Sequence, residues 1–116
     1  MSEARDKSIA VVNESVQNSV LDKLITQIQK DLLRTGVVYD FFNFSEDDLF
    51  DALKSILNRL ITDKRDLLYA FLYAVDVSEA SINAIVEHNT MTEVEQLTYL
   101  ILKREYMKIA YREGIL

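Results

Sequence analysis

Apolar residues recur at helical spacing along most of this chain. The first helix is predicted from about Glu14 to Thr35. Its apolar face comprises Val20, Leu21, Leu24, Ile25, Ile28, Leu32 and Leu33. Polar side chains, among them Gln27 and Asp31, are assigned to the opposite face. Gly36 follows at the position where a left-handed residue commonly ends a helix, so the element is expected to stop there.

Further helices are predicted along the rest of the chain by the same spacing. They lie at about 46–63, 64–75, 79–88 and 93–112. Ser45, Ser78 and Thr92 stand at the N-cap positions of three of them, where a side-chain oxygen accepts a hydrogen bond from an orphan backbone N–H. Gly114 is predicted to end the last helix.

Three segments differ from this pattern. Residues 67–75 are an unbroken apolar run, so their helix is predicted to be the least exposed of all. Residues 37–44 are rich in β-branched and aromatic side chains and are interpreted as an extended linker that fills the core. Residues 1–13 have no decisive pattern, and whether this N-terminal segment is ordered or disordered is left open.

The turn-forming residues support an all-α fold. The chain of 116 residues has two glycines and no proline, whereas sheets with many tight turns usually require both residue types. We therefore predict a single helical domain over residues 14–116, a compact bundle of about five helices with short loops.

The composition limits which partners, which cysteine-based sites and which cellular compartment are expected for the protein. The net charge is −6, which disfavours nucleic acid and anionic lipid as partners. Without cysteine there is no disulfide, no thiolate and no Cys-based metal site. No apolar run is long enough for a signal-peptide core near the start or for a membrane span, so we expect a cytoplasmic protein without membrane contact.

Residues 72–86 have the spacing of a helix-turn-helix. Val77, Ser78 and Ile82 match the pattern, but Asp76 stands where the turn usually has glycine. From Asp66 to Leu102 the chain has six acidic residues and no Lys or Arg. A DNA-binding helix needs cations to neutralise phosphates, so two packed helices with a capped turn is the favoured interpretation.

Acid–base or metal chemistry has little support in the sequence. The acidic cluster Glu46, Asp47, Asp48 and Asp51 is favoured by the dipole at the start of a helix and lacks the glycine of a calcium loop. His88 is the only histidine, and no phosphate loop or nucleophile elbow accompanies it. We predict no enzyme activity, no metal ion and no cofactor.

Two segments are similar to a family of small, uncharacterised, all-helical bacterial cytoplasmic proteins. They are Leu67-Leu-Tyr-Ala-Phe-Leu-Tyr-Ala-Val-Asp-Val-Ser-Glu79 and Leu100-Ile-Leu-Lys-Arg-Glu-Tyr-Met-Lys108. Together they cover about a fifth of the chain. The resemblance implies a stand-alone cytoplasmic domain and transfers no functional residue.

The last predicted helix has two apolar stripes, and a helix on the surface of a monomer needs only one. Tyr99, Leu102, Tyr106 and Ile109 form the second stripe, which we interpret as a homodimer interface. Its polar rim would comprise Lys103, Glu105 and Arg112. The alternative is that residues 1–13 or the 37–44 linker folds over this stripe.

Three functions follow from these observations. The leading hypothesis is a protein–protein interaction or structural module that associates with itself. One alternative is a transcription-associated protein with a divergent helix-turn-helix at residues 72–86. Another is a small-ligand binder or enzyme with a carboxylate-lined pocket, which would require a deep pocket containing buried acids.

Overall fold

The computed structural model describes residues 3–37, 48–86 and 91–115. It contains six α-helices: α1 (Glu3–Gln17), α2 (Leu21–Leu33), α3 (Leu49–Asp63), α4 (Arg65–Val75), α5 (Glu79–Val86) and α6 (Met91–Arg112). There is no strand among the described residues. The predicted all-α class is confirmed, with one helix more than expected, and the helices form a compact globule with a radius of gyration of 13.2 Å.

The additional helix arises because the predicted helix of residues 14–35 is divided in two. Ser19 adopts a left-handed conformation with φ of 58°. The N–H of Val20 then donates to the carbonyl of Ser15 at 2.8 Å, and the chain turns from α1 into α2. This break was not predicted, because left-handed residues are usually glycine or asparagine. Residues 3–13, whose order the sequence left open, are helical and belong to α1.

The same hydrogen-bonded motif ends four of the helices. A left-handed residue is followed by Val or Ile, whose N–H donates to the carbonyl five residues earlier. The left-handed residues are Ser19, Gly36, Asp76 and Gly114. The two glycines were predicted as helix ends, and these predictions are confirmed. In this way the chain turns sharply and places an apolar residue next to the core after α1, α2 and α4.

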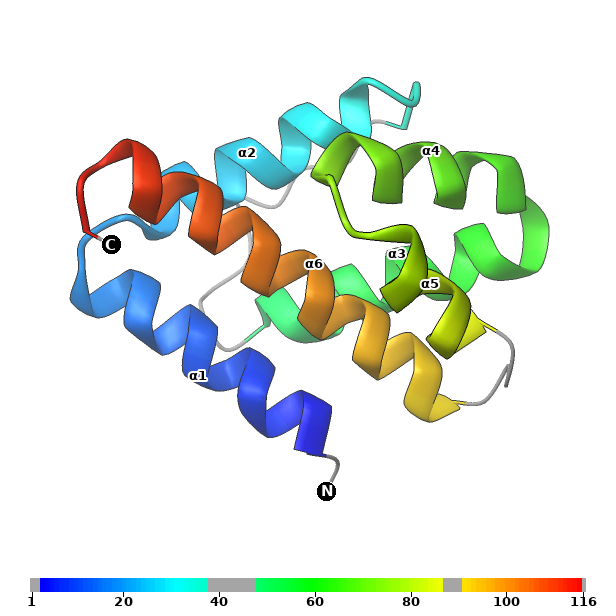
Figure 1. Cartoon of the computed structure of the whole chain (residues 1–116), viewed down its shortest axis with the longest axis horizontal. Helices are drawn as coiled ribbons and strands as arrows, with labels where there is room; N and C mark the ends of the chain where they lie inside the picture. The colour runs from blue at the N-terminus through cyan, green and yellow to red at the C-terminus, as the bar shows by residue number, and fades with distance from the viewer. Residues whose placement is uncertain (1–2, 38–47, 87–90, 116) are drawn as a thin grey trace.

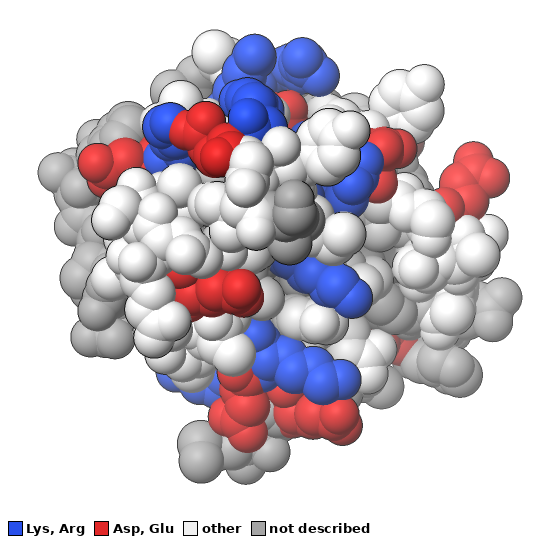
Figure 2. Space-filling model, turned by 60° about the vertical axis from the view of Figure 1, so that its left-hand side comes forward, with Lys and Arg blue, Asp and Glu red and all other residues white. Residues whose placement is uncertain are grey.

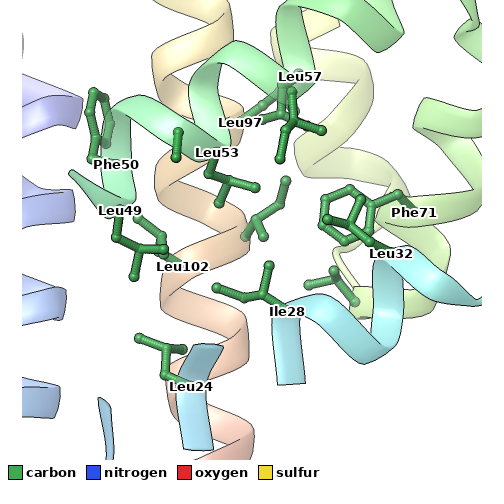
Figure 3. Packing of buried hydrophobic residues seen from close by; sticks show 14 of the residues in the cluster. Leu24, Ile28, Leu32, Leu49, Phe50, Leu53, Leu57, Phe71, Leu97 and Leu102 are labelled. Carbon is green, nitrogen blue, oxygen red and sulfur yellow. The ribbon is translucent and has the colours of Figure 1, made fainter. Parts of the chain in front are cut away.

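Helix α6 is the centre of the fold. It contacts α1, α2, α3, α4 and α5, and it runs diagonally across the molecule with α1 along one side (Figure 1). Its residues Ile101 and Leu102 are completely buried. Side chains from α2, α3, α4 and α6 converge in the core, where Leu53 of α3, Phe71 of α4 and Leu102 of α6 are seen (Figure 3).

The prediction that residues 67–75 form the least exposed helix is wrong. Leu68, Phe71, Leu72 and Val75 of α4 are buried, but Tyr73 is 86% exposed. The apolar run is continuous only when tyrosine and alanine are counted as apolar. Tyrosine and alanine also occur at solvent-exposed positions, so α4 has an ordinary buried face and an outer face with exposed tyrosines.

The remaining helix boundaries agree with the sequence to within a few residues. α5 begins at Glu79 as predicted, and the N–H of Ser81 donates to the Ser78 hydroxyl oxygen at 3.2 Å. α6 begins at Met91, two residues earlier than expected. The predicted cap Ser45 and nearly all of the 37–44 linker lie outside the described residues. Within the described residues, no helix has the length and apolarity that crossing a membrane requires.

Candidate functional site

Large apolar side chains are exposed on the outer face of the C-terminal half of α6 and in the turn that follows it. Met107 is 39% exposed, Tyr111 is 82% exposed and Ile115 is 37% exposed. Met107 and Tyr111 are four residues apart on α6, which is the spacing that aligns side chains along one side of a helix, whereas Ile115 follows the left-handed Gly114 outside the helix. We call Met107 and Tyr111 the outer stripe of α6.

A row of cations adjoins the outer stripe at the same spacing. Arg104 donates to Asp76 at 2.8 Å, and Lys108 donates to Asp31 at 3.1 Å. Arg112 donates to the side-chain amide oxygen of Gln27 at 3.0 Å, which is a neutral partner. That bond fixes the position of the Arg112 guanidinium but does not neutralise its charge.

These residues line an open surface groove of about 580 Å³, formed by Arg104, Met107, Lys108, Tyr111 and Arg112. A second groove of about 330 Å³ runs between α2 and α6 and shares Arg112 with the first. Figure 2 shows Lys and Arg side chains in the upper, middle and lower parts of one face of the molecule, with Asp and Glu among them. The face as a whole is therefore mixed in charge.

Beneath the cation row lies a buried charged cluster that connects α2 to α6. Asp31 and Glu105 are both completely buried. Lys108 reaches between them, with its ammonium 3.1 Å from Asp31 Oδ2 and 2.6 Å from Glu105 Oε1. The side-chain amide of Gln27 donates to both oxygens of Asp31 at 3.3 Å.

The two buried carboxyl groups differ in their affinity for protons. Burial opposes ionisation of Asp31, but hydrogen bonds with Glu105, Lys108 and Gln27 outweigh it and lower the pKa of Asp31. Burial and the hydrogen bond with Asp31 raise the pKa of Glu105 to about 8, against the opposing effect of Lys108. With its pKa at about 8, Glu105 is largely protonated at neutral pH, and the Lys108 ammonium lies beside its Oε1.

The sequence placed Asp31 on a polar helix face and Glu105 on an exposed rim, and both predictions are wrong. The position of each residue relative to the apolar face of its helix did indicate that it is buried. Asp31 lies three residues after Ile28, and Glu105 lies four residues before Ile109, so both fall on apolar faces. Charged residues are almost never fully buried unless they are paired, and the partner residues were not visible in the sequence.

The predicted dimer stripe is not a free surface. Leu102, Tyr106 and Ile109 are buried within the chain's own core. α1 packs along this side of α6, and Asn18 donates to the Tyr106 hydroxyl at 2.8 Å. Leu102, Tyr106 and Ile109 are thus buried within the chain, and their assignment to an interface between copies is corrected.

Tyr99, the fourth residue of that stripe, is half-buried. The ammonium groups of Lys7 and Lys103 lie 5.8 Å and 5.9 Å from the centre of its ring. These are cation–π contacts at the edge between α1 and α6. Tyr99 is thus held within the chain, with cations on its ring.

Residues 72–86 do form two helices joined by a tight turn. Asp76 has φ of 73°, so it adopts the left-handed conformation that glycine usually supplies in this motif. The exposed positions of α5 include Glu79, Ala80 and Asn83, and none of them is a cation. A groove of about 370 Å³ between α4 and α5 is lined by Tyr69, Tyr73, Val77, Glu79, Ile82 and Asn83.

Only part of the acidic cluster considered from the sequence falls within the described residues. Asp48 and Asp51 are exposed, and Asp51 accepts a hydrogen bond from Arg5 at 2.8 Å, while Glu46, Asp47 and His88 lie outside the described residues. The described residues contain no group of three or more acidic or histidine side chains arranged to hold a metal ion. Asp31 and Glu105 do not line any of the grooves described above.

Comparison with known proteins does not identify a relative: no family model, curated protein or solved structure matches this chain.

Proposed function

We propose that this chain is a protein–protein interaction module whose partner binds the outer stripe of α6. The observation that carries the proposal is the exposure of Tyr111, at 82%, one helical turn from the exposed Met107, with exposed Ile115 just beyond the end of the helix. Isolated apolar side chains are common on protein surfaces, but an aligned row on one helix is the pattern by which an amphipathic partner is recognised.

The composition of this surface favours a protein partner. Tyrosine, methionine and arginine are enriched at protein interfaces, and here they are adjacent along one helix. The α6 core beneath the stripe is fully packed, so the stripe is held on a rigid element. A partner therefore meets an ordered surface and does not have to order the helix on binding.

The cation row defines the chemistry of the partner. Arg112 has a neutral amide as its hydrogen-bond partner, and Arg104 is bound to an Asp76 that is itself exposed. Carboxylates on the partner would complement both guanidinium groups at the rim of the apolar stripe. We expect a partner that presents an apolar row beside acidic side chains.

Photo-crosslinking in the native cell tests this proposal. The photoreactive amino acid p-benzoylphenylalanine would replace Tyr111, and the same residue would replace the exposed Thr62 on α3 as a control. We expect a discrete crosslinked species from position 111 that is absent from position 62. If both positions give the same products, or neither gives any, the proposed interaction surface is wrong.

A further inference from the structure

A second exposed stripe lies on α4, and its charges are opposite to those of α6. Tyr69 is 43% exposed and Tyr73 is 86% exposed, one helical turn apart. Asp66 lies three residues before the first tyrosine, and Asp76 lies three residues after the second. Both aspartates are exposed. We call Asp66, Tyr69, Tyr73 and Asp76 the α4 stripe.

The two stripes meet at one point of the surface. The salt bridge between Arg104 and Asp76, at 2.8 Å, joins the start of the cation row to the end of the α4 stripe. From this contact α4 extends to one side and the C-terminal half of α6 to the other (Figure 1). The Arg104–Asp76 contact therefore joins the helix that has the cation row to the helix that has the α4 stripe, and both helices have exposed tyrosine.

Resting on the proposed function, we propose that the partner is a second copy of this chain, with the outer stripe of α6 in each copy packed on the α4 stripe of the other. A two-fold axis near the Arg104–Asp76 contact brings the α6 half of one copy opposite the α4 half of its partner. The arrangement is a closed dimer, because both stripes of each copy are covered by the other copy and neither is left to bind a third.

The dimensions of the two stripes agree with this arrangement. At 1.5 Å per residue, Arg104 to Arg112 spans about 12 Å and Asp66 to Asp76 spans about 15 Å. When Arg104 lies opposite Asp76 at the axis, Arg112 comes opposite Asp66 at the far end. Tyr111 then lies opposite Tyr69, and the apolar side chains are enclosed between the two charged ends.

The distribution of charge favours a second copy as the occupant. Arg112 is the cation of the row whose hydrogen-bond partner is neutral, so an acidic group on the partner would complement it, and this chain has no Lys or Arg between Asp66 and Leu102. That same segment carries the exposed Tyr69 and Tyr73. The apolar row beside acidic side chains that the α6 surface requires is therefore present on the chain itself.

Sedimentation equilibrium on variants with exchanged charges tests this pairing. We expect the unsubstituted chain to dimerise, and Arg112→Glu or Asp66→Lys alone to weaken dimerisation at least about tenfold by placing like charges opposite each other. The double variant Arg112→Glu with Asp66→Lys restores opposite charges and is expected to dimerise within about threefold of the original chain. Arg59→Glu, at an exposed position on α3, is the matched control and should change nothing.

Circular dichroism establishes that each variant is folded, and if Arg112→Glu does not fold, Asp66→Lys alone must still weaken the dimer. A chain that remains a monomer at every concentration overturns the self-association. A dimer that neither single change weakens, or that the double change does not restore, overturns the proposed pairing. If position 111 crosslinks to a different protein while the purified chain is monomeric, the proposed function stands and the second copy is excluded as its partner.

Discussion

Ser19 occupies a left-handed backbone position, where a side chain is unfavourable and glycine is not. We predict that Ser19→Gly raises the free energy of unfolding by about 1 kcal/mol, because it relieves this steric cost in the folded state. Urea denaturation of the two proteins measures the difference.

The matched control for this prediction is Ser55→Gly. Ser55 is exposed in the interior of α3, where glycine lowers helix stability by about 0.5 kcal/mol. The same substitution should thus have opposite effects at the two positions. If Ser19→Gly instead lowers the free energy of unfolding, the left-handed conformation assigned to Ser19 between α1 and α2 is contradicted.

Glu105 should make the folded protein less stable as the pH rises. Its pKa is raised to about 8 in the folded state, while an unfolded glutamate has a pKa of about 4.3. Between these two values the folded state holds about one proton more than the unfolded state, so the free energy of unfolding falls with increasing pH. The stabilisation is complete below the unfolded value and is lost as the pH passes through 8.

Urea unfolding at a series of pH values from 5 to 9, on the original chain and on Glu105→Gln, tests this dependence. The amide of glutamine still donates to Asp31 and does not ionise, so the falling slope between about pH 4.3 and 8 should disappear in the variant. An identical slope in both proteins would contradict the assignment of the proton to Glu105.

At the scale of the elements, the apolar spacing was sufficient to predict the helical class and most helix boundaries. It was insufficient at Ser19, because the break depends on a backbone conformation that any residue type can adopt at some cost. It also failed for the exposure of α4, since the run of residues 67–75 includes tyrosine and alanine on its outer side. Tertiary contacts, which the sequence does not display, decided both features.

The interaction surface was only partly predictable for the same reason. The sequence indicated that the last helix has more apolar surface than one core face requires. It assigned Tyr106 to an interface, whereas α1 covers that residue. Met107 and Tyr111 are exposed instead, and identifying them required knowledge of which side of α6 faces α1.

The two faces of α4 should respond differently to truncation. Leu68→Ala or Phe71→Ala should lower the free energy of unfolding by about 2–5 kcal/mol, because each leaves a cavity in the core. Tyr73→Ala removes a side chain that is 86% exposed, and at a protein concentration low enough for the chain to be monomeric it should change the free energy of unfolding by less than about 0.5 kcal/mol. Denaturant midpoints that are equal for all three variants would contradict the orientation of α4.

At the scale of the whole molecule, the distribution of charged side chains favours a protein partner over a DNA partner. α4 and α5 form a helix-turn-helix geometry, but the exposed residues of α5 include Glu79 and no cation among those described. We predict that the protein does not bind duplex DNA specifically at physiological salt. Tight binding in a gel-shift experiment, abolished by changing Ser81 and Asn83, would contradict this prediction.

The pairing of α6 with α4 of a second copy is tested most directly by mixed disulfide formation, because the chain has no cysteine of its own. Tyr69→Cys, in the α4 stripe, and Tyr111→Cys would be prepared separately, mixed and oxidised, with the exposed Thr62→Cys as the control partner. The account predicts a disulfide-linked dimer of the Tyr69→Cys and Tyr111→Cys chains that forms faster than any product with Thr62→Cys. Equal rates of linkage for all pairs, or no linkage between positions 69 and 111, would contradict it.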